Sequence, residues 1–278
     1  VQRTFTHFSR IVPRNGFIVL NGDDPHLQAL GPMGWTQVVR VGVGVGCDAR
    51  IVDFSESAAG AEFTLCWRGQ VWAHVNWSQP GMFNARNAAM AATAAGLALD
   101  AGNPTSLSLA PLAKFRGVKR RQEILWSTKR LTVIEDFGHH PTALAETLQS
   151  FRARFPGAIL TAVFEPRSNT ARVKTLQTAV MQALALADEV YIGAIDRPEK
   201  IRDEERLDTA AIVQHLAAQG LAGYSSPSNQ ALLATLVTNT LKADQNGASK
   251  PRLVAFFTNG SFDGIISGFV AAAKATAS

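Results

Sequence analysis

Polar side chains suited to ligand binding are concentrated in three short segments of the sequence, each directly after a run of apolar residues. The segments are 136–140, 165–170 and 258–264. In the second, Arg167 precedes Ser168, Asn169 and Thr170 at the start of a predicted helix. A guanidinium group and a helix N-terminus can bind a carboxylate together. Alternatively, Ser168 or Thr170 only caps the helix and Arg167 is solvated.

Two adjacent histidines, His139 and His140, follow Asp136 in the first segment. Neighbouring histidines on an extended turn diverge, and no third residue has familiar zinc spacing, so we predict no metal site here. The histidines can bind a ligand, or one can pack while the other bonds to a backbone carbonyl group. Their position between a strand and a helix that begins with proline favours ligand binding, because α/β sheets place ligand contacts there.

A cluster of basic residues, which indicates an anionic ligand, precedes these segments. Lys114, Arg116, Lys119, Arg120 and Arg121 lie within eight residues of one another. The neighbourhood lacks the interleaved aromatic residues that nucleic-acid binding usually needs, so we expect no nucleic-acid partner. A few guanidinium groups suffice for the phosphates of a small nucleotide, which is the ligand that the cluster favours.

Asn84 and Asn87 are three residues apart near the start of a predicted helix, which places both amides near one face. Amides can pair with the edge of adenine, although Asn84 alone is also a plain N-cap candidate. The VGVGVG segment at 41–46 precedes another strand rather than a helix, so we interpret it as a turn. The chain contains no GxxxxGK[ST] motif, so the main phosphate cradle of any bound ATP lies outside this sequence.

The sequence pattern changes along the chain from a part rich in predicted strands to a part in which strands and helices alternate. Short β-branched and aromatic runs predict strands near 17–20, 38–41, 51–54, 62–67 and 70–77. An alanine-rich helix at 84–99 and a second helix at 104–115 complete this part. From 124 onward strands and helices alternate, including helices at 141–155 and 171–187, which predicts a mostly parallel, doubly wound α/β sheet. Ligands bind at the carboxyl ends of the strands of such sheets, where the three polar segments lie.

The length and composition of the chain limit the class of protein to which it can belong. The chain has 278 residues, a net charge of +5 and two cysteines, which is too few for a disulfide framework. This length suggests two domains. No apolar run is long enough for a membrane span and no signal peptide is present, so we expect a soluble, cytoplasmic protein with no membrane partner. Because the sequence starts at Val1, we expect it to be a piece of a longer chain.

Five motifs, taken in their order along the chain, resemble a known family, although no single one of them is specific for it. They are GMFNARNAAMAATAAG, FRGVKRRQEI, TVIEDFGHHPTAL, VFEPRSNT and FFTNGSFDGI. In this order they resemble the C-terminal two-thirds of the Mur ligase family, whose members use ATP to join amino acids or peptides to UDP-N-acetylmuramate. The EPRSNT and TNGSFDG stretches are most similar to the branch that recycles the murein tripeptide L-alanyl-γ-D-glutamyl-meso-diaminopimelate.

The resemblance implies the domain organisation. Residues 1–116 would be the latter part of a central ATPase domain, and residues 117–278 a C-terminal Rossmann-like domain that binds the incoming amine. The N-terminal UDP-binding domain and the phosphate loop would belong to the same parent chain outside this sequence. ATP and Mg²⁺ are the implied cofactors, with the principal magnesium ligands also outside, so this fragment alone is expected to be inactive.

The resemblance also implies roles for residues on the nucleotide side. Asn84 and Asn87 match an adenine-contacting HNxxN pattern, in which Phe83 stands where the family has histidine. Arg121 is similar to a residue that reaches the nucleotide phosphates, and Asp136 to one that contacts the ribose region.

On the substrate side, His139 and His140 match a turn that lines the amino substrate, and Arg121 and His139 are the implied catalytic candidates. The family recognises the incoming peptide in the stretch that contains Arg167, Ser168, Asn169 and Thr170 here. Our assignment of Arg167 to a substrate carboxylate is a chemical inference, because the tripeptide carries several carboxylates.

The implied reaction phosphorylates the lactyl carboxylate of UDP-N-acetylmuramate, and the amine of the tripeptide then displaces phosphate from the acyl phosphate. Two alternatives remain open. One is a ligase that adds L-alanine to UDP-N-acetylmuramate. The other is a non-catalytic module that binds a nucleotide or a peptide.

Overall fold

The computed structural model of the protein describes residues 2–30, 33–242 and 250–277. The chain divides into two compact units, Val1–Gly117 and Val118–Ser278, whereas the sequence placed the division after residue 116. Each unit has its own β-sheet and its own buried apolar clusters. None of the helices in the described residues has the length and apolar character that crossing a membrane requires.

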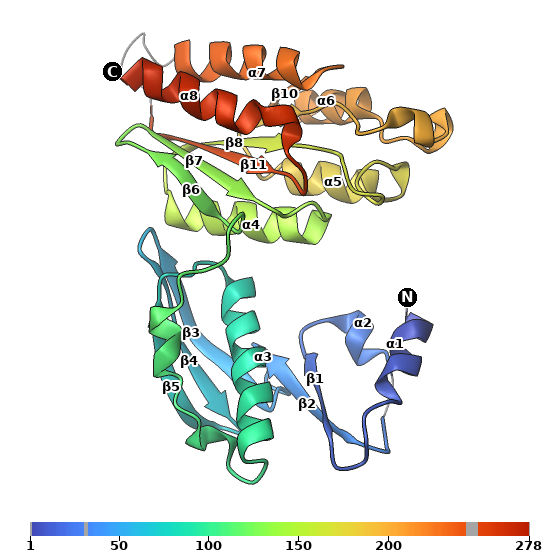
Figure 1. The fold of residues 1–278 in the computed structure, drawn as a ribbon, viewed down its shortest axis with the longest axis vertical. Helices are drawn as coiled ribbons and strands as arrows, with labels where there is room; N and C mark the ends of the chain where they lie inside the picture. The colour runs from blue at the N-terminus through green and yellow to red at the C-terminus, as the bar shows by residue number, and fades with distance from the viewer. Residues whose placement is uncertain (1, 31–32, 243–249, 278) are drawn as a thin grey trace. The chain divides into compact units, whose positions relative to one another are not determined.

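The first unit is a five-stranded sheet with a long helix packed against it (Figure 1). The strand order is β1-β2-β3-β4-β5, with β1, β2 and β3 parallel and β3, β4 and β5 antiparallel. In chain order its helices and strands are α1 (Gln2–Ser9), β1 (Phe17–Asn21), α2 (Pro25–Gln28), β2 (Gln37–Gly42), β3 (Ala49–Ser57), β4 (Gly60–Trp67), β5 (Gln70–Trp77) and α3 (Met82–Leu99).

Small side chains let helix α3 lie close to the sheet. Ala85, Ala88, Ala89 and Ala92 are buried at helical spacing and pack in one cluster with apolar residues of the sheet. These sheet residues include Val41, Ile51, Phe63, Leu65 and Val75. The alanine-rich helix predicted at 84–99 is therefore confirmed, with its first turn starting two residues earlier.

The VGVGVG segment is the turn between β2 and β3, as predicted. The carboxylate of Asp23 accepts hydrogen bonds from the backbone N–H groups of Val43 at 3.0 Å and Gly44 at 3.0 Å. A β-carbon at Gly42 would lie 2.5 Å from Asp23 Oδ2, so glycine at this position makes room for the carboxylate. The turn is thus built around an acidic side chain rather than a phosphate.

The second helix predicted in this unit, at 104–115, is wrong. The segment forms two short 3₁₀ turns, η1 (Pro104–Ser106) and η2 (Ala110–Lys114), separated by extended backbone at Leu107. The carbonyl group of Leu107 accepts a hydrogen bond of 3.0 Å from Trp72 Nε1. This tertiary contact fixes the extended residue where helical periodicity had predicted continuity.

The second unit contains a six-stranded sheet with the order β10-β9-β8-β11-β7-β6. All neighbours are parallel except β6 and β7, which confirms the predicted mostly parallel sheet. Its main elements are β6 (Glu123–Ser127), β7 (Leu131–Asp136), α4 (Pro141–Arg154), β8 (Ile159–Phe164), α5 (Gln177–Leu184), β9 (Glu189–Ile192), α6 (Thr209–Ala218), β10 (Ala222–Ser225), α7 (Asn229–Val237), β11 (Arg252–Phe257) and α8 (Ile265–Ala277).

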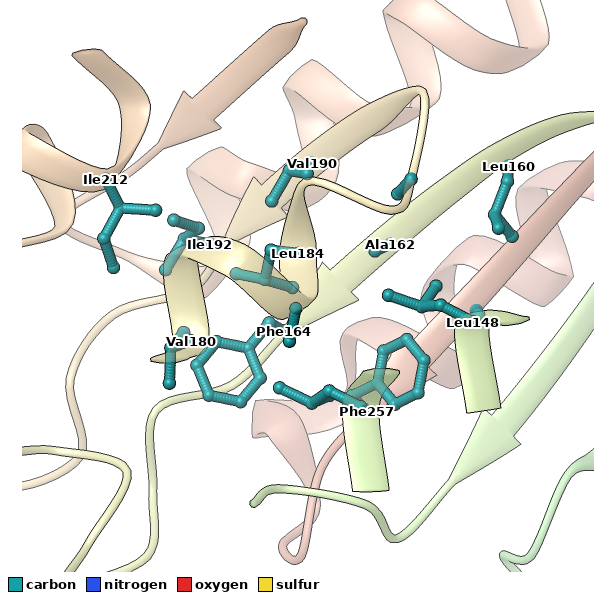
Figure 2. Packing of buried hydrophobic residues seen from close by; sticks show 14 of the residues in the cluster. Leu148, Leu160, Ala162, Phe164, Val180, Leu184, Val190, Ile192, Ile212 and Phe257 are labelled. Carbon is teal, nitrogen blue, oxygen red and sulfur yellow. The ribbon is translucent and has the colours of Figure 1, made fainter. Parts of the chain in front are cut away.

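Helices cover both faces of this sheet, as Figure 1 shows for α4 and α5 on one face and α7 and α8 on the other. Apolar residues of α4, α5 and α6 form one buried cluster with the strands, and those of α7 and α8 form another. Figure 2 shows the first cluster, in which Phe164 and Phe257 from neighbouring strands lie among Leu148, Val180 and Leu184. Burial on both faces explains why the central strands β8 and β11 are almost continuous apolar runs.

Candidate active site

The three polar segments begin at one edge of the second sheet. Strands β8, β11 and β7 are adjacent, and Phe257 of β11 pairs with both Phe164 of β8 and Asp136 of β7. The carboxyl ends of these parallel strands therefore lie level with one another. The segments that follow them are brought together as the sequence predicted for a doubly wound sheet.

Asp136 is buried, with 3% of its surface exposed, and its carboxylate is held by backbone groups. Oδ2 accepts a hydrogen bond from Gln122 N at 3.0 Å, and Oδ1 accepts one from Gly138 N at 2.6 Å. Phe137 N also donates to the carbonyl group of Arg120 at 2.7 Å. Burial raises the pKa of the Asp136 carboxyl, and the backbone hydrogen bonds oppose this increase. The aspartate thus ties the Arg120–Gln122 loop to the end of β7.

The two arginines of this loop have different surroundings. Arg120 Nε lies 2.6 Å from Glu135 Oε1, and its Nη2 donates to the carbonyl groups of Thr258 and Gly260. Arg121 is exposed, and its guanidinium group lies 5.2 Å from the centre of the Phe137 ring. Arg120, which the sequence grouped with the basic residues expected to bind phosphates, is therefore the structural member of the pair. Arg121, the predicted member, faces solvent and can meet an anion.

The two histidines also differ. His139 Nδ1 lies 3.0 Å from the carbonyl oxygen of Phe137, which can only accept, so Nδ1 carries the proton and Nε2 of the neutral ring is an acceptor. His140 is the N-cap of α4, where its Nδ1 accepts a hydrogen bond of 3.4 Å from Thr142 N. His139 thus makes the backbone carbonyl contact of one sequence alternative, whereas His140 is exposed and caps α4 instead of packing.

Arg167 lies among acidic groups beside the end of β8. Its Nη1 is 3.6 Å from Glu165 Oε1 and 3.8 Å from Asp196 Oδ1. Its side chain also passes directly over Gly260, where a β-carbon would be 2.6 Å from Arg167 Cζ. Arg120 bonds to the carbonyl group of Gly260, so the same residue of the TNGSFDG segment links the two groups of predicted residues.

The helix predicted at 171–187 begins only at Gln177, so no helix N-terminus stands beside Arg167. Ser168 Oγ accepts a hydrogen bond from Ala171 N at 3.0 Å and lies 3.3 Å from Thr170 Oγ1, which closes an isolated turn. Val173 then pairs with Arg206 in an isolated bridge, and this tertiary pairing prevents an earlier helical start. The prediction that a helix N-terminus helps to bind a carboxylate here is therefore wrong.

A polar pocket of about 530 Å³ opens beside these residues. It is lined by Arg167, Ser168, Asn169, Arg172, Asp196, Arg197, Lys200 and Asn259. Asp196, Arg197 and Lys200 come from the loop after β9, which the sequence analysis did not single out. Its position after a strand was the signal that could have found it. Among the described residues, Asn259 Oδ1 is buried without a hydrogen-bond partner, so the pocket offers a ligand one unused acceptor.

The predicted adenine-contacting residues lie in the first unit, on α3. The N-cap of this helix is Gly81, so the alternative that Asn84 is the N-cap is wrong. Asn84 Nδ2 instead donates to the carbonyl group of Pro80 at 2.6 Å. Asn87 is exposed one turn further along the helix, with Phe83 beside Asn84 in sequence. An exposed amide on this face is available to a nucleobase.

Within residues 2–30, 33–242 and 250–277, no three histidine, cysteine, aspartate or glutamate side chains are grouped to hold a metal ion. A Mg²⁺ ion that binds together with ATP usually takes only one or two carboxylates from the protein, because phosphates and waters supply its other ligands.

Comparisons with known proteins place these observations in a family context. Residues 120–246 match the family model described as Mur ligase, glutamate ligase domain. A UDP-N-acetylmuramate–L-alanine ligase of Acidithiobacillus ferrooxidans is 32% identical over 228 residues, which are 80% of this chain and 48% of that protein. The UDP-N-acetylmuramate–L-alanyl-γ-D-glutamyl-meso-2,6-diaminoheptandioate ligase of Escherichia coli is 34% identical over 198 residues, 69% of this chain and 41% of that protein.

The fold shows the same relationship over nearly the whole chain. The crystal structure of a murein peptide ligase from Psychrobacter arcticus matches 98% of this chain and 54% of its own, with a TM-score of 0.65 and 26% identity. The chain spans about half the length of these relatives.

Proposed function

Because residues 120–246 belong to the family of Mur ligase glutamate ligase domains, we propose that the chain is part of an ATP-dependent peptidoglycan ligase whose amino substrate is L-alanyl-γ-D-glutamyl-meso-diaminopimelate. The second unit would bind this tripeptide, and the first unit would contribute to binding ATP. The other substrate would be UDP-N-acetylmuramate, which the relatives' names share.

The pocket beside Arg167 is the observation that carries the choice of substrate. Four of its lining side chains are basic, namely Arg167, Arg172, Arg197 and Lys200, and Asp196 is its acidic member. A tripeptide that ends in diaminopimelate brings several carboxylates and a free ammonium group, whereas L-alanine brings one carboxylate. A pocket of about 530 Å³ with this charge pattern suits the larger, multiply charged substrate.

On the substrate side, Arg167 would bind a carboxylate of the tripeptide, and Ser168, Asn169 and Thr170 would add polar contacts. His140 would line the same edge of the sheet while it caps α4. His139, whose Nε2 is free to accept a proton in the neutral ring, would take up the proton that the attacking amine loses.

On the nucleotide side, the exposed Arg121 would bind phosphate oxygens and neutralise charge that develops during transfer. Asp136 would act by holding the Arg120–Gln122 loop that carries Arg121. The Asn84 and Asn87 amides would meet adenine, and Phe83 can stack on the base but cannot supply a hydrogen bond. The principal magnesium ligands would belong to the part of the complete protein outside this sequence, so we assign no magnesium step to this chain.

ATP would supply the phosphoryl group that converts the lactyl carboxylate of UDP-N-acetylmuramate into an acyl phosphate. The peptide amine would then attack the acyl carbon, phosphate would leave with the electrons of the broken C–O bond, and an amide bond would form. This chemistry depends on positioning and charge neutralisation.

A second candidate function is the addition of L-alanine to UDP-N-acetylmuramate. The specific observation in its favour is that several of the relatives similar to this chain are named UDP-N-acetylmuramate–L-alanine ligases. The charged pocket and the EPRSNT stretch argue for the tripeptide instead.

The test is ADP release by the complete protein that contains this chain, with UDP-N-acetylmuramate, Mg-ATP and one of two amino substrates. Release with the tripeptide but not with L-alanine is expected. Release with L-alanine but not with the tripeptide would establish the second candidate. Silence with both would favour a non-catalytic module that binds a nucleotide or a peptide.

Arg167→Ala in the complete protein should raise the KM for the tripeptide at least about tenfold and change kcat much less, because the lost ion pair forms when the peptide binds. Arg130→Ala is the matched control, since Arg130 is an exposed arginine in the turn at the other end of β7. A large loss of kcat with an unchanged KM would contradict the binding role of Arg167.

A further inference from the structure

Glu165 is a buried carboxylate at the candidate active site that the proposed reaction does not use. It follows the last residue of β8, and its backbone N–H donates to the carbonyl group of Phe257 at 3.0 Å, which extends the β8–β11 pairing by one residue. Only 2% of its surface is exposed. A carboxylate at this depth loses its hydration and must be compensated by neighbouring groups.

Both carboxylate oxygens of Glu165 have a partner at the site. Thr258 Oγ1, itself fully buried, donates to Oε2, and Arg167 Nη1 lies 3.6 Å from Oε1. The Thr258 hydroxyl also accepts a hydrogen bond of 2.8 Å from Gly260 N. One chain of contacts therefore runs from the backbone of Gly260 through Thr258 and Glu165 to the guanidinium group of Arg167.

Gly260 confines Arg167 from another direction. A β-carbon at residue 260 would lie 2.6 Å from Arg167 Cζ, so any other residue at this position would require the arginine side chain to shift. Asp196 stands 3.8 Å from the same Nη1 atom. The position of the guanidinium group is thus fixed by the buried carboxylate of Glu165, the partly exposed carboxylate of Asp196 and the space left by the missing side chain of Gly260.

We propose that Glu165 is the positioning residue for Arg167. Thr258 holds the Glu165 carboxylate, which fixes the guanidinium group over Gly260 so that it faces the polar pocket beside Arg167. Because Glu165 is 2% exposed, it acts through Arg167 and does not touch the ligand. The identity of the ligand group as a carboxylate of the tripeptide rests on the proposed function. The positioning of Arg167 by Glu165 does not depend on that function.

Glu165→Gln is the informative variant, because glutamine keeps the shape and can still accept from Thr258 while it removes the charge that faces Arg167. In the complete protein we expect the KM for the tripeptide to rise about tenfold, with kcat and the KM for ATP changed less than about twofold. A loss of kcat at unchanged KM would overturn the proposal.

Two further positions displace Arg167 by independent routes. Gly260→Ala places a β-carbon against the arginine while Glu165 stays intact, so its KM effect should match that of Glu165→Gln. Thr258→Val removes the hydroxyl that holds Glu165, and Thr258→Ser should restore wild-type KM because it keeps the hydroxyl. Equal KM values for the valine and serine variants would contradict the role of Thr258.

The matched control is Glu189→Gln. Glu189 starts β9 and pairs with Arg252, which starts β11, at the opposite end of the sheet from the pocket. This substitution also removes a carboxylate charge from a largely buried ion pair, so it tests for general damage to the sheet. It should leave the tripeptide KM unchanged.

A spectroscopic measurement separates this proposal from the proposed function. In the chain labelled with ¹⁵N at arginine Nε, the Nε–Hε signal of Arg167, identified by its absence in Arg167→Lys, should shift in Glu165→Gln and stay in place in Glu189→Gln. An Arg167 signal that Glu165→Gln leaves unmoved overturns the positioning role. A shifted signal in a protein that does not ligate the tripeptide supports the positioning role and contradicts the proposed function.

Discussion

Arg120 and Arg121 are neighbours in the sequence, yet substitutions at the two positions should have opposite consequences. Arg120→Ala removes an ion pair with Glu135 and hydrogen bonds to Thr258 and Gly260, and should cost about 2 kcal/mol of folding free energy. Arg121→Ala should leave the stability within about 0.5 kcal/mol because its side chain is exposed. In the complete protein, Arg121→Ala should lower kcat at least about a hundredfold.

Urea unfolding of both variants and ADP release by the complete protein check this pair. Equal destabilisation by the two substitutions would contradict the division into a structural and a functional arginine.

The charge of Glu165 predicts a pH dependence of stability. Burial raises the pKa of this carboxyl, with the charge of Asp263 adding to the increase and Thr258 and Arg167 opposing it. Between the ordinary glutamate pKa of about 4.3 and the raised value, the folded state holds a proton that the unfolded state has lost. The contribution of Glu165 to stability therefore falls as pH rises through this window.

Glu165→Gln lacks this titration, so the stability of the wild type relative to the variant should be greater at pH 4 than at pH 7. Unfolding by urea at both values measures the difference, in which titrations common to the two proteins cancel. A difference that grows towards pH 7 would show that ion pairing outweighs burial at this carboxyl.

Single residues were predictable from the sequence where their role depends on local position. The residues after β7 and β8 were found because strand ends in α/β sheets bind ligands. The individual roles of Arg120, Glu165 and Asp196 were not predicted, because they come from contacts with Gly260, Thr258 and Arg167, which lie far away in the sequence. No local pattern distinguishes such residues from ordinary charged ones.

At the scale of elements, the glycine-rich turn between β2 and β3 offers a direct test of what specifies it. Gly42→Ala would bring a β-carbon to 2.5 Å from the Asp23 carboxylate, which is itself held by the turn's backbone, and should cost about 1–3 kcal/mol. Gly46→Ala meets nothing within 4 Å and should stay within about 0.5 kcal/mol. Urea unfolding measures both, and equal effects would show that contact with Asp23 does not shape the turn.

Elements were predictable where apolar periodicity and local sequence agree. The strands of both sheets and helix α3 follow their periodic runs. The helix predicted at 104–115 is absent, and the one predicted at 171–187 is shortened to Gln177–Leu184. Contacts hold part of each segment extended, at Leu107 beside Trp72 and at Val173 beside Arg206. Helix propensity is a weak preference that such tertiary contacts override.

At the scale of the whole molecule, two cores imply two separately stabilised units. Every residue of the buried cluster around Leu65 belongs to residues 1–117, and the two other clusters belong to residues 118–278. Leu65→Ala, at a fully buried position, should cost about 2–5 kcal/mol and lower hydrogen-exchange protection in β3, β4 and α3 while β7, β8 and β11 keep theirs. Leu253→Ala should produce the reverse pattern. Loss of protection across both units in either variant would mean that the chain unfolds as one cooperative body.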